Sequence, residues 1–260
     1  MVFNSIFFIF CFLPVFMMIY YLVPGKLRNL LLFLGSLIFY AWGEPVYVIL
    51  MLFSSIFNYY MGTELERLYY DDRKQKINLI FSIIINLAVL VFFKYYGFLL
   101  NTIGGIIGIH IPHPELSLPI GLSFYTFRNL SYLFDIYLSK VSAQRNFLTF
   151  AVYSTMFPYT SAGPIVRYAD IETQLKQRTI NISKFGIGAE LFVKGLAKKV
   201  LLADNLSVLY SSICGHPQMS VFTSWLGILA YTMQLYFDFS GYSDMAIGLG
   251  HMFGFRFLEN

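Results

Sequence analysis

Long apolar segments, rather than short amphipathic repeats, dominate this sequence of 260 residues. They lie at about 3–23, 29–42, 46–61, 77–100, 118–138, 147–160, 185–205 and 221–250. A helix needs ~20 residues, with a range of ~17–25, to cross the hydrocarbon core of a bilayer. Hydrophobic residues make up 57% of the chain and charged residues 12%, about half the share of ~25% in soluble domains. The sequence therefore predicts an all-α, multi-spanning integral membrane protein with the lipid bilayer as its solvent.

The segments differ in length. Those long enough to span without difficulty are 3–23, 77–100, 118–138 and 221–250. The segments 29–42 and 46–61 are short and meet at Gly43-Glu44-Pro45, which predicts two short spans joined by a tight turn. The first apolar run has neither a basic region before it nor a small-residue cleavage site, so we expect it to be a retained first span.

Basic residues gather in alternate connections. The connection 24–29 holds Lys26 and Arg28, 62–76 holds Arg67, Arg73, Lys74 and Lys76, and 139–146 holds Lys140 and Arg145. The connections 43–45 and 101–117 hold no basic residue. Because short cytoplasmic loops are enriched in Lys and Arg, we expect a multi-pass protein of the cell (plasma or inner) membrane with its amino terminus outside. The net charge of +4 is too small to indicate a nucleic acid partner.

The segment 147–160 breaks this alternation. It is short, ends at Pro158, and leads into a second basic stretch with Arg167, Lys176 and Arg178, so both of its flanks are expected in the cytoplasm. The pattern predicts a re-entrant segment, which must be surrounded by protein or line a water-filled cavity. We find no repeat and no long linker, so residues 1–260 are predicted to form a single membrane domain.

Ionisable residues inside apolar segments are the first candidates for a site, because a charge at membrane depth usually faces a partner or a wet cavity. Arg128 and Asp135 are seven residues apart with Ser131 between them, which places all three on one helical face. This face either forms a polar seam between helices or lines a substrate path. Arg167 follows the stretch MFPYTSAGPIV, where it is either a topology marker or a ligand for an anionic group such as the phosphates of an acyl carrier.

The stretch 183–205 predicts a helix with Ser183 as its N-cap. Glu190, Lys194 and Lys198 recur every four residues and share one face. Lys194, Lys198 and Lys199 are interpreted as interfacial basic residues, and the alternative is a span whose lysines face a cavity.

The last apolar segment carries Gln234 and Asp238 one turn apart, with Asp244 further along. Two carboxylates at this depth favour a functional role, although hydrogen bonding between helices would also explain them. Glycines at 241, 248, 250 and 254 permit close helix approach.

Neither the cysteines nor the histidines form a convincing centre. Cys11 and Cys214 offer no disulfide framework and no Cys-rich metal site. His110, His113 and His216 lie in loops beside prolines, without the helical or turn partners that a metal pair would need. His251 lies near a span and is interpreted as an interfacial side chain. We therefore expect no metal site among these residues, and a catalytic role stays the alternative for His251.

Several stretches, in order, resemble the membrane-bound O-acyltransferase (MBOAT) family, and specifically its bacterial alginate O-acetylation branch. They are AWGEP, LPIGLSFYTF with SYLFDIY, AGPIVRY, GLAKKVLLADNL, and QLYFDFSGYSDMAIGLG with the final FLEN, so the resemblance covers about 40–260. It implies a ring of transmembrane helices around a thin centre. There an acyl group from a cytosolic thioester donor, acetyl-CoA or an acyl carrier protein, meets a hydroxyl acceptor of the outer face, with no bound cofactor. It also implies partners that carry the acyl group outward, such as an extracytoplasmic acyltransferase or a polysaccharide-export protein.

The sequence departs from the family's pattern in two places. The family's catalytic histidine lies in a Trp- and Arg-rich stretch that would follow Asn260, so this chain is expected to be an incomplete enzyme, inactive alone. Arg128 stands where many alginate-branch relatives have glutamine, and relatives that transfer D-alanine to teichoic acid are more similar there. Acetyl transfer to a polysaccharide is the preferred interpretation; D-alanyl transfer, a transporter and a non-catalytic scaffold stay open.

Overall fold

The computed structural model describes residues 2–109, 117–216 and 220–258, and all regular structure in these residues is helical. The predicted all-α class is confirmed. The chain divides into two compact units, each considered separately below: Met1–Leu31, Ala162–Val166 and Asp170–Asn260 form unit 1, and Leu32–Ser161 with Arg167–Ala169 forms unit 2. The single membrane domain stays a prediction.

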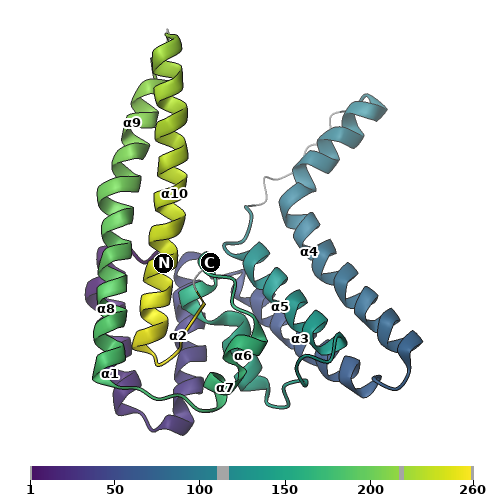
Figure 1. The fold of residues 1–260 in the computed structure, drawn as a ribbon. Coiled ribbons are helices and arrows are strands. Elements are labelled where there is room, and N and C mark those ends of the chain that lie inside the picture. The colour runs from purple at the N-terminus through teal and green to yellow at the C-terminus, as the bar shows by residue number, and fades with distance from the viewer. Residues whose placement is uncertain (1, 110–116, 217–219, 259–260) are drawn as a thin grey trace. The chain divides into compact units, whose positions relative to one another are not determined.

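Unit 1 is built around a long helical hairpin. Its first arm is continuous from α8 (Ile182–Ala197) through the π-helical turn η4 (Lys198–Ala203) to α9 (Asp204–Cys214). Its second arm is α10 (Val221–Met252), which runs alongside the first (Figure 1). Asn181, not the predicted Ser183, caps α8, because its side chain accepts a hydrogen bond from the Lys184 N–H at 2.7 Å. The cap thus lies two residues earlier than expected.

The rest of unit 1 comprises short helices. The π-helical turn η1 (Phe8–Phe12) continues into α1 (Leu13–Leu22), η2 (Gly25–Leu27) follows, and most of α7 (Tyr168–Lys176) lies in this unit. The Tyr20 hydroxyl donates to the Phe253 carbonyl at 2.8 Å, which fixes α1 to the end of α10.

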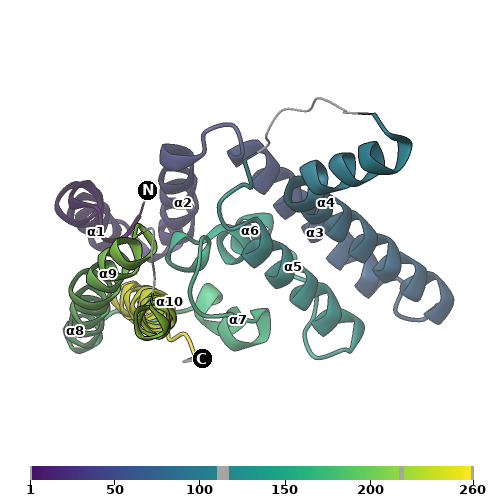
Figure 2. The same ribbon diagram turned by 90° about the horizontal axis from the view of Figure 1, so that it is seen from above.

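Unit 2 contains most of α2 (Arg28–Gly43), followed by α3 (Val48–Arg67), α4 (Asp72–Ile107), α5 (Leu122–Tyr137), α6 (Phe147–Thr155) and the 3₁₀ turn η3 (Phe157–Tyr159). Helices α3, α4 and α5 pack against one another, as the view from above shows (Figure 2). Asp71 caps α4 at its start, and Gly108, with a φ of 77°, ends it in the left-handed conformation.

Within the described residues, two helices are both long and apolar enough to cross a membrane, α3 and α4. The prediction that 46–61 is a short span is wrong, because α3 continues to Arg67 and has 20 residues. The predicted span 118–138 is also shorter than expected: α5 has 16 residues, because Gly121 and the turn before it interrupt the helix. Helix α10 has 32 residues but is not apolar enough to pass the same test.

The segment 147–160 does not continue as a helix. Helix α6 ends at Thr155, Met156 adopts a φ of −54° and a ψ of 118°, and η3 supplies one tight turn around Pro158. The prediction that Pro158 prevents a continuous helix is confirmed. That the segment enters and leaves on one side of the membrane stays a prediction.

Candidate functional site

Carboxylates of α10 meet lysines of η4 in unit 1. Lys198 Nζ lies 2.6 Å from Asp244 Oδ2, and Lys199 Nζ lies 2.8 Å from Asp238 Oδ1 and 3.0 Å from Asp204 Oδ1. Only 23% of the Lys199 side chain is exposed. Lys198, Lys199, Asp204, Asp238 and Asp244 thus form one cluster of charges, which we call the η4–α10 cluster.

A π-helical turn presents the two lysines. Adjacent residues of an α-helix point ~100° apart, yet Lys198 and Lys199 both reach α10. Both lie in η4, whose wider i→i+5 turn interrupts the α-helical register between α8 and α9. Such π turns are frequent at functional sites. Lys194 lies one turn earlier and pairs at 2.6 Å with Glu190 of its own helix; the interfacial role of all three lysines stays a prediction.

Glycines bring the two arms into contact. A Cβ at Gly241 would lie 2.8 Å from the Gly195 carbonyl oxygen, and one at Gly248 would lie 2.5 Å from that of Gly188. The close approach predicted at Gly241 and Gly248 is confirmed. Gly250 instead faces the Phe257 ring, and Gly254 takes a φ of 85°. Small residues at such contacts allow side-chain pairs between helices to form at short range.

Three further polar atoms on α10 are shielded from solvent and have no hydrogen-bond partner among the described residues: Gln234 Oε1, Ser240 Oγ and Ser243 Oγ. Leaving such a group unpaired costs about 1–3 kcal/mol. Gln234 was predicted as a candidate, whereas Ser240 and Ser243 were missed because single serines carry little signal in an apolar run. Together with the acids of the η4–α10 cluster, they add to the polar groups that α10 carries.

In unit 2, Arg128 holds the broken segment after α6. Its side chain is 3% exposed and donates to the Ser154 carbonyl at 2.9 Å and to the Tyr159 carbonyl at 2.6 Å. Its guanidinium carbon also lies 4.1 Å from the centre of the Tyr159 ring. Carbonyls at a helix end have no partner within the helix. The planar guanidinium satisfies two of them at once and stacks on the ring.

Asp135 lies two turns along the same helix and is 6% exposed. Its Oδ1 is 4.0 Å from Lys140 Nζ, and its Oδ2 is shielded without a hydrogen-bond partner among the described residues. Ser131, between the two, is half-buried. Arg167 is exposed. The role of these residues in a substrate path stays a prediction.

A network of small polar side chains connects α3, α4, α5 and α6, and the sequence reasoning missed it. Asn58 and Asn86 exchange two amide hydrogen bonds, at 3.0 and 2.9 Å. Asn129 donates to Ser54 at 3.2 Å and accepts from Ser154 at 3.0 Å. The sequence did carry a signal for this network: Asn58 and Asn86 are single asparagines within apolar runs, and such side chains often form hydrogen bonds between helices.

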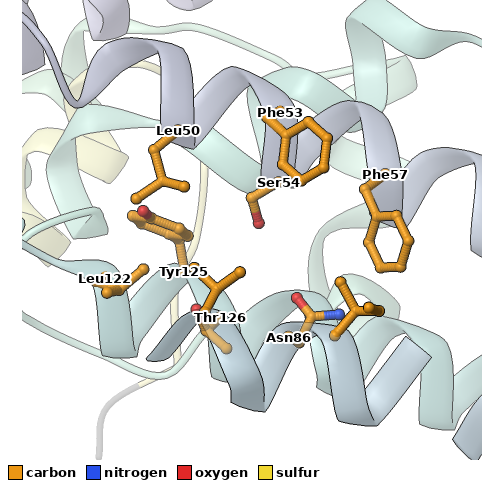
Figure 3. A pocket seen from close by; sticks show the side chains of 10 residues that line it. Leu50, Phe53, Ser54, Phe57, Asn86, Leu122, Tyr125 and Thr126 are labelled. Carbon is orange, nitrogen blue, oxygen red and sulfur yellow. The ribbon is translucent and has the colours of Figure 1, made fainter. Parts of the chain in front are cut away.

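Part of this network borders a small cavity of about 10 Å³, at the lower limit of what can hold one water molecule. Figure 3 shows Phe53, Ser54 and Phe57 of α3 on one side of it and Asn86, Tyr125 and Thr126 on the other. The cavity is too small for an acyl group.

The histidines occupy three different settings. His110 and His113 lie outside the described residues. His216 follows α9 and is exposed, and His251 lies half-buried in the last turn of α10. That none of them is the catalytic base stays a prediction.

The described residues are all helical where they are regular, and two of their helices, α3 and α4, are long and apolar enough to cross a membrane. A sequence profile of the MBOAT, membrane-bound O-acyltransferase family matches residues 37–260. The chain belongs to the membrane-bound O-acyltransferase family, and the resemblance inferred over about 40–260 is confirmed.

Individual relatives agree with this membership. A "probable alginate O-acetylase" of Pseudomonas aeruginosa is 42% identical over 100% of this chain and 51% of its own length. A peptidoglycan O-acetyltransferase of Helicobacter pylori is 32% identical over 98% of this chain and 55% of its own length. A teichoic acid D-alanyltransferase of Bacillus subtilis is 27% identical over 58% of this chain and 39% of its own length. The chain spans about half the length of the first two of these relatives, which match it over 98–100% of its residues.

Proposed function

We propose that the chain is part of a membrane O-acyltransferase that moves an acetyl group from a cytosolic thioester donor towards hydroxyls of an extracytoplasmic polysaccharide, as in alginate O-acetylation. The observation that carries the proposal is the 42% identity to an alginate O-acetylase over the whole chain. Acyl transfer of this kind needs a base that takes the hydroxyl proton while the oxygen attacks the thioester carbonyl and the thiolate leaves.

The same proposal includes the acyl donor, the membrane topology and the partner proteins. The donor is acetyl-CoA or an acyl carrier protein, bound as a substrate and not as a cofactor. The protein is multi-pass in the cell membrane with its amino terminus outside, which the alternation of basic connections supports. An extracytoplasmic acyltransferase or a polysaccharide-export protein receives the acetyl group.

Roles within the chain follow from chemistry and position. We assign the substrate path to Arg128, Asp135, Arg167, Gln234, Asp238 and Asp244, and the catalytic base to a histidine beyond Asn260. Buried charge supports Arg128 and Asp135, and the shielded Oε1 supports Gln234. Arg128 would act indirectly, by fixing the backbone that follows α6, because its side chain donates hydrogen bonds to the Ser154 and Tyr159 carbonyls.

The test is transfer of labelled acetate in membranes that contain the complete reading frame with residues 1–260. We expect label to pass from acetyl-CoA to polysaccharide, and Asp238→Asn to lower the rate while expression is unchanged. Lys194→Gln, at an exposed pair on α8, is the control. If Asp238→Asn transferred label at an unchanged rate, Asp238 would not belong to the substrate path. If no thioester donated label, the proposed acyltransferase activity would be refuted.

The acceptor has two further candidates, because one relative is named a peptidoglycan O-acetyltransferase and another a teichoic acid D-alanyltransferase. Supplying alginate, peptidoglycan and teichoic acid in parallel, with acetyl or D-alanyl donors, separates these alternatives. Label on teichoic acid alone would replace acetyl transfer by D-alanyl transfer.

A further inference from the structure

Unit 2 contains a polar cavity at the end of its two longest apolar helices. It has a volume of about 430 Å³ and lies where α3 ends, α4 begins and the loop after α5 folds back. Its polar lining is Glu66, Tyr69, Tyr70, Ser139, Lys140 and Ser142. Small-molecule sites commonly measure ~300–1,000 Å³, so the cavity can hold a group of several heavy atoms.

Two residues of opposite charge, Glu66 and Lys140, line the cavity. Glu66 accepts a hydrogen bond from the Ala143 N–H at 3.1 Å and forms an ion pair with Arg145, which ties the 138–146 loop to α3. A carboxylate has about four acceptor positions, so Glu66 can accept further hydrogen bonds. It can therefore accept a hydrogen bond from a cationic ligand group without giving up either contact, although Arg145 offsets its charge.

Lys140 supplies the positive charge. Its side chain is 56% exposed, and the closest carboxylate oxygen among the described residues is Asp135 Oδ1 at 4.0 Å, the limit of an ion pair. An ammonium group has three donors. Ser139 and Ser142 line the same cavity, and each has a hydroxyl that can act as a donor.

The position of the cavity indicates its ligand. Helices α3 and α4 are long and apolar enough to cross a bilayer, and the connection between Arg67 and Asp72 borders the cavity. The cavity thus lies at a membrane surface, where tyrosines such as Tyr69 and Tyr70 are enriched. Phospholipid headgroups occupy this interfacial region.

We propose that this cavity binds the headgroup of a zwitterionic phospholipid of the phosphoethanolamine type. Its phosphate lies at Lys140 and the serine hydroxyls, and its ammonium lies at Glu66 and the tyrosine rings. A ligand with several negative charges fits less well, because the carboxylates of Glu66 and Asp135 and the carboxyl ends of α3 and α5 repel anions. The proposal does not depend on acyl transfer, because it rests only on the cavity and the membrane-length helices.

The experiment measures binding of short-chain phosphatidylethanolamine to the purified full-length protein by native mass spectrometry. Phosphatidylglycerol, inorganic phosphate and coenzyme A serve as competitors. We expect phosphatidylethanolamine to bind better than the other three, and Lys140→Gln to weaken it about tenfold, as loss of one charge-assisted hydrogen bond predicts. Lys140→Arg should retain most of the binding, because it keeps the charge.

Lys74→Gln is the matched control, because Lys74 is exposed, pairs with Asp71 and lies in the first turn of α4, next to the α3–α4 connection. Circular dichroism and melting temperature confirm that each variant folds. Equal binding by Lys140→Gln and wild type, or a preference for phosphatidylglycerol, would overturn the proposal. Displacement of the lipid by coenzyme A would instead assign the cavity to a thioester donor.

Discussion

The ammonium group of Lys199 lies between two carboxylates, 2.8 Å from Asp238 of α10 and 3.0 Å from Asp204 at the start of α9. The two acids come from different arms of the hairpin in unit 1, so one lysine pairs with both. Removing the lysine and removing one acid are therefore unequal changes: the first leaves two carboxylates without their partner, and the second leaves Lys199 paired with Asp204.

This asymmetry predicts an order of stabilities. Lys199→Met should lower the free energy of unfolding by about 1–3 kcal/mol, as expected for polar groups left unpaired. Asp238→Asn should cost less than about 1 kcal/mol. Thermal unfolding in detergent measures both, with Lys194→Met at an exposed pair as control. An Asp238→Asn variant less stable than Lys199→Met would contradict the shared pairing.

Gly248→Ala should separate the arms of the hairpin. The added Cβ would lie 2.5 Å from the Gly188 carbonyl oxygen, which is backbone and cannot turn aside. We expect a loss of about 1–3 kcal/mol, typical of overpacking. Gly186→Ala on α8 is the matched control, because its Cβ would meet nothing within 4 Å, and it should be neutral or stabilising by up to ~1 kcal/mol. Equal melting temperatures would show that the helices can move apart without cost.

Arg128→Lys keeps the charge but loses the planar pair of donors and the ring contact. We expect the break after α6 to loosen and stability to fall by about 1.5–3 kcal/mol, the contribution of a hydrogen bond to a charged group. Protease sensitivity and melting temperature report the two effects. Arg167→Lys, at an exposed position, should change neither. If Arg128→Lys left both the protease sensitivity and the melting temperature unchanged, the positive charge alone would be enough to hold the segment after α6.

The amide pair of Asn58 and Asn86 should show energetic coupling. Each single change to Leu leaves the other amide without its partner, whereas the double change removes both. A double-mutant cycle should give a coupling of about 0.6 kcal/mol, and at most ~1.7, the range found between membrane helices. Asn58→Leu combined with Asn205→Leu, on a different unit, is the additive control. Additivity in both cycles would show that the pair contributes nothing specific.

Several site features were visible in the sequence because they depend on local chemistry. The placement of Arg128 and Asp135 on one helical face follows from their spacing, and both side chains are buried. Pro158 indicated the end of a helix, and the glycines at 241 and 248 indicated a close contact. Partner choice was not visible in this way: Lys198 and Lys199 read as interfacial, but each pairs with a carboxylate of α10 about 40 residues away.

The sequence by itself determined the all-α class, the membrane environment and the family, because apolar content and ordered motifs do not depend on how helices pack. Only the tertiary structure decided which polar groups meet. The π-helical register of η4, the bonds from Arg128 to two carbonyls and the exchange between Asn58 and Asn86 each join residues distant in sequence or shift a helical phase. Such contacts are set by the packing of whole helices, which no local pattern of residues encodes.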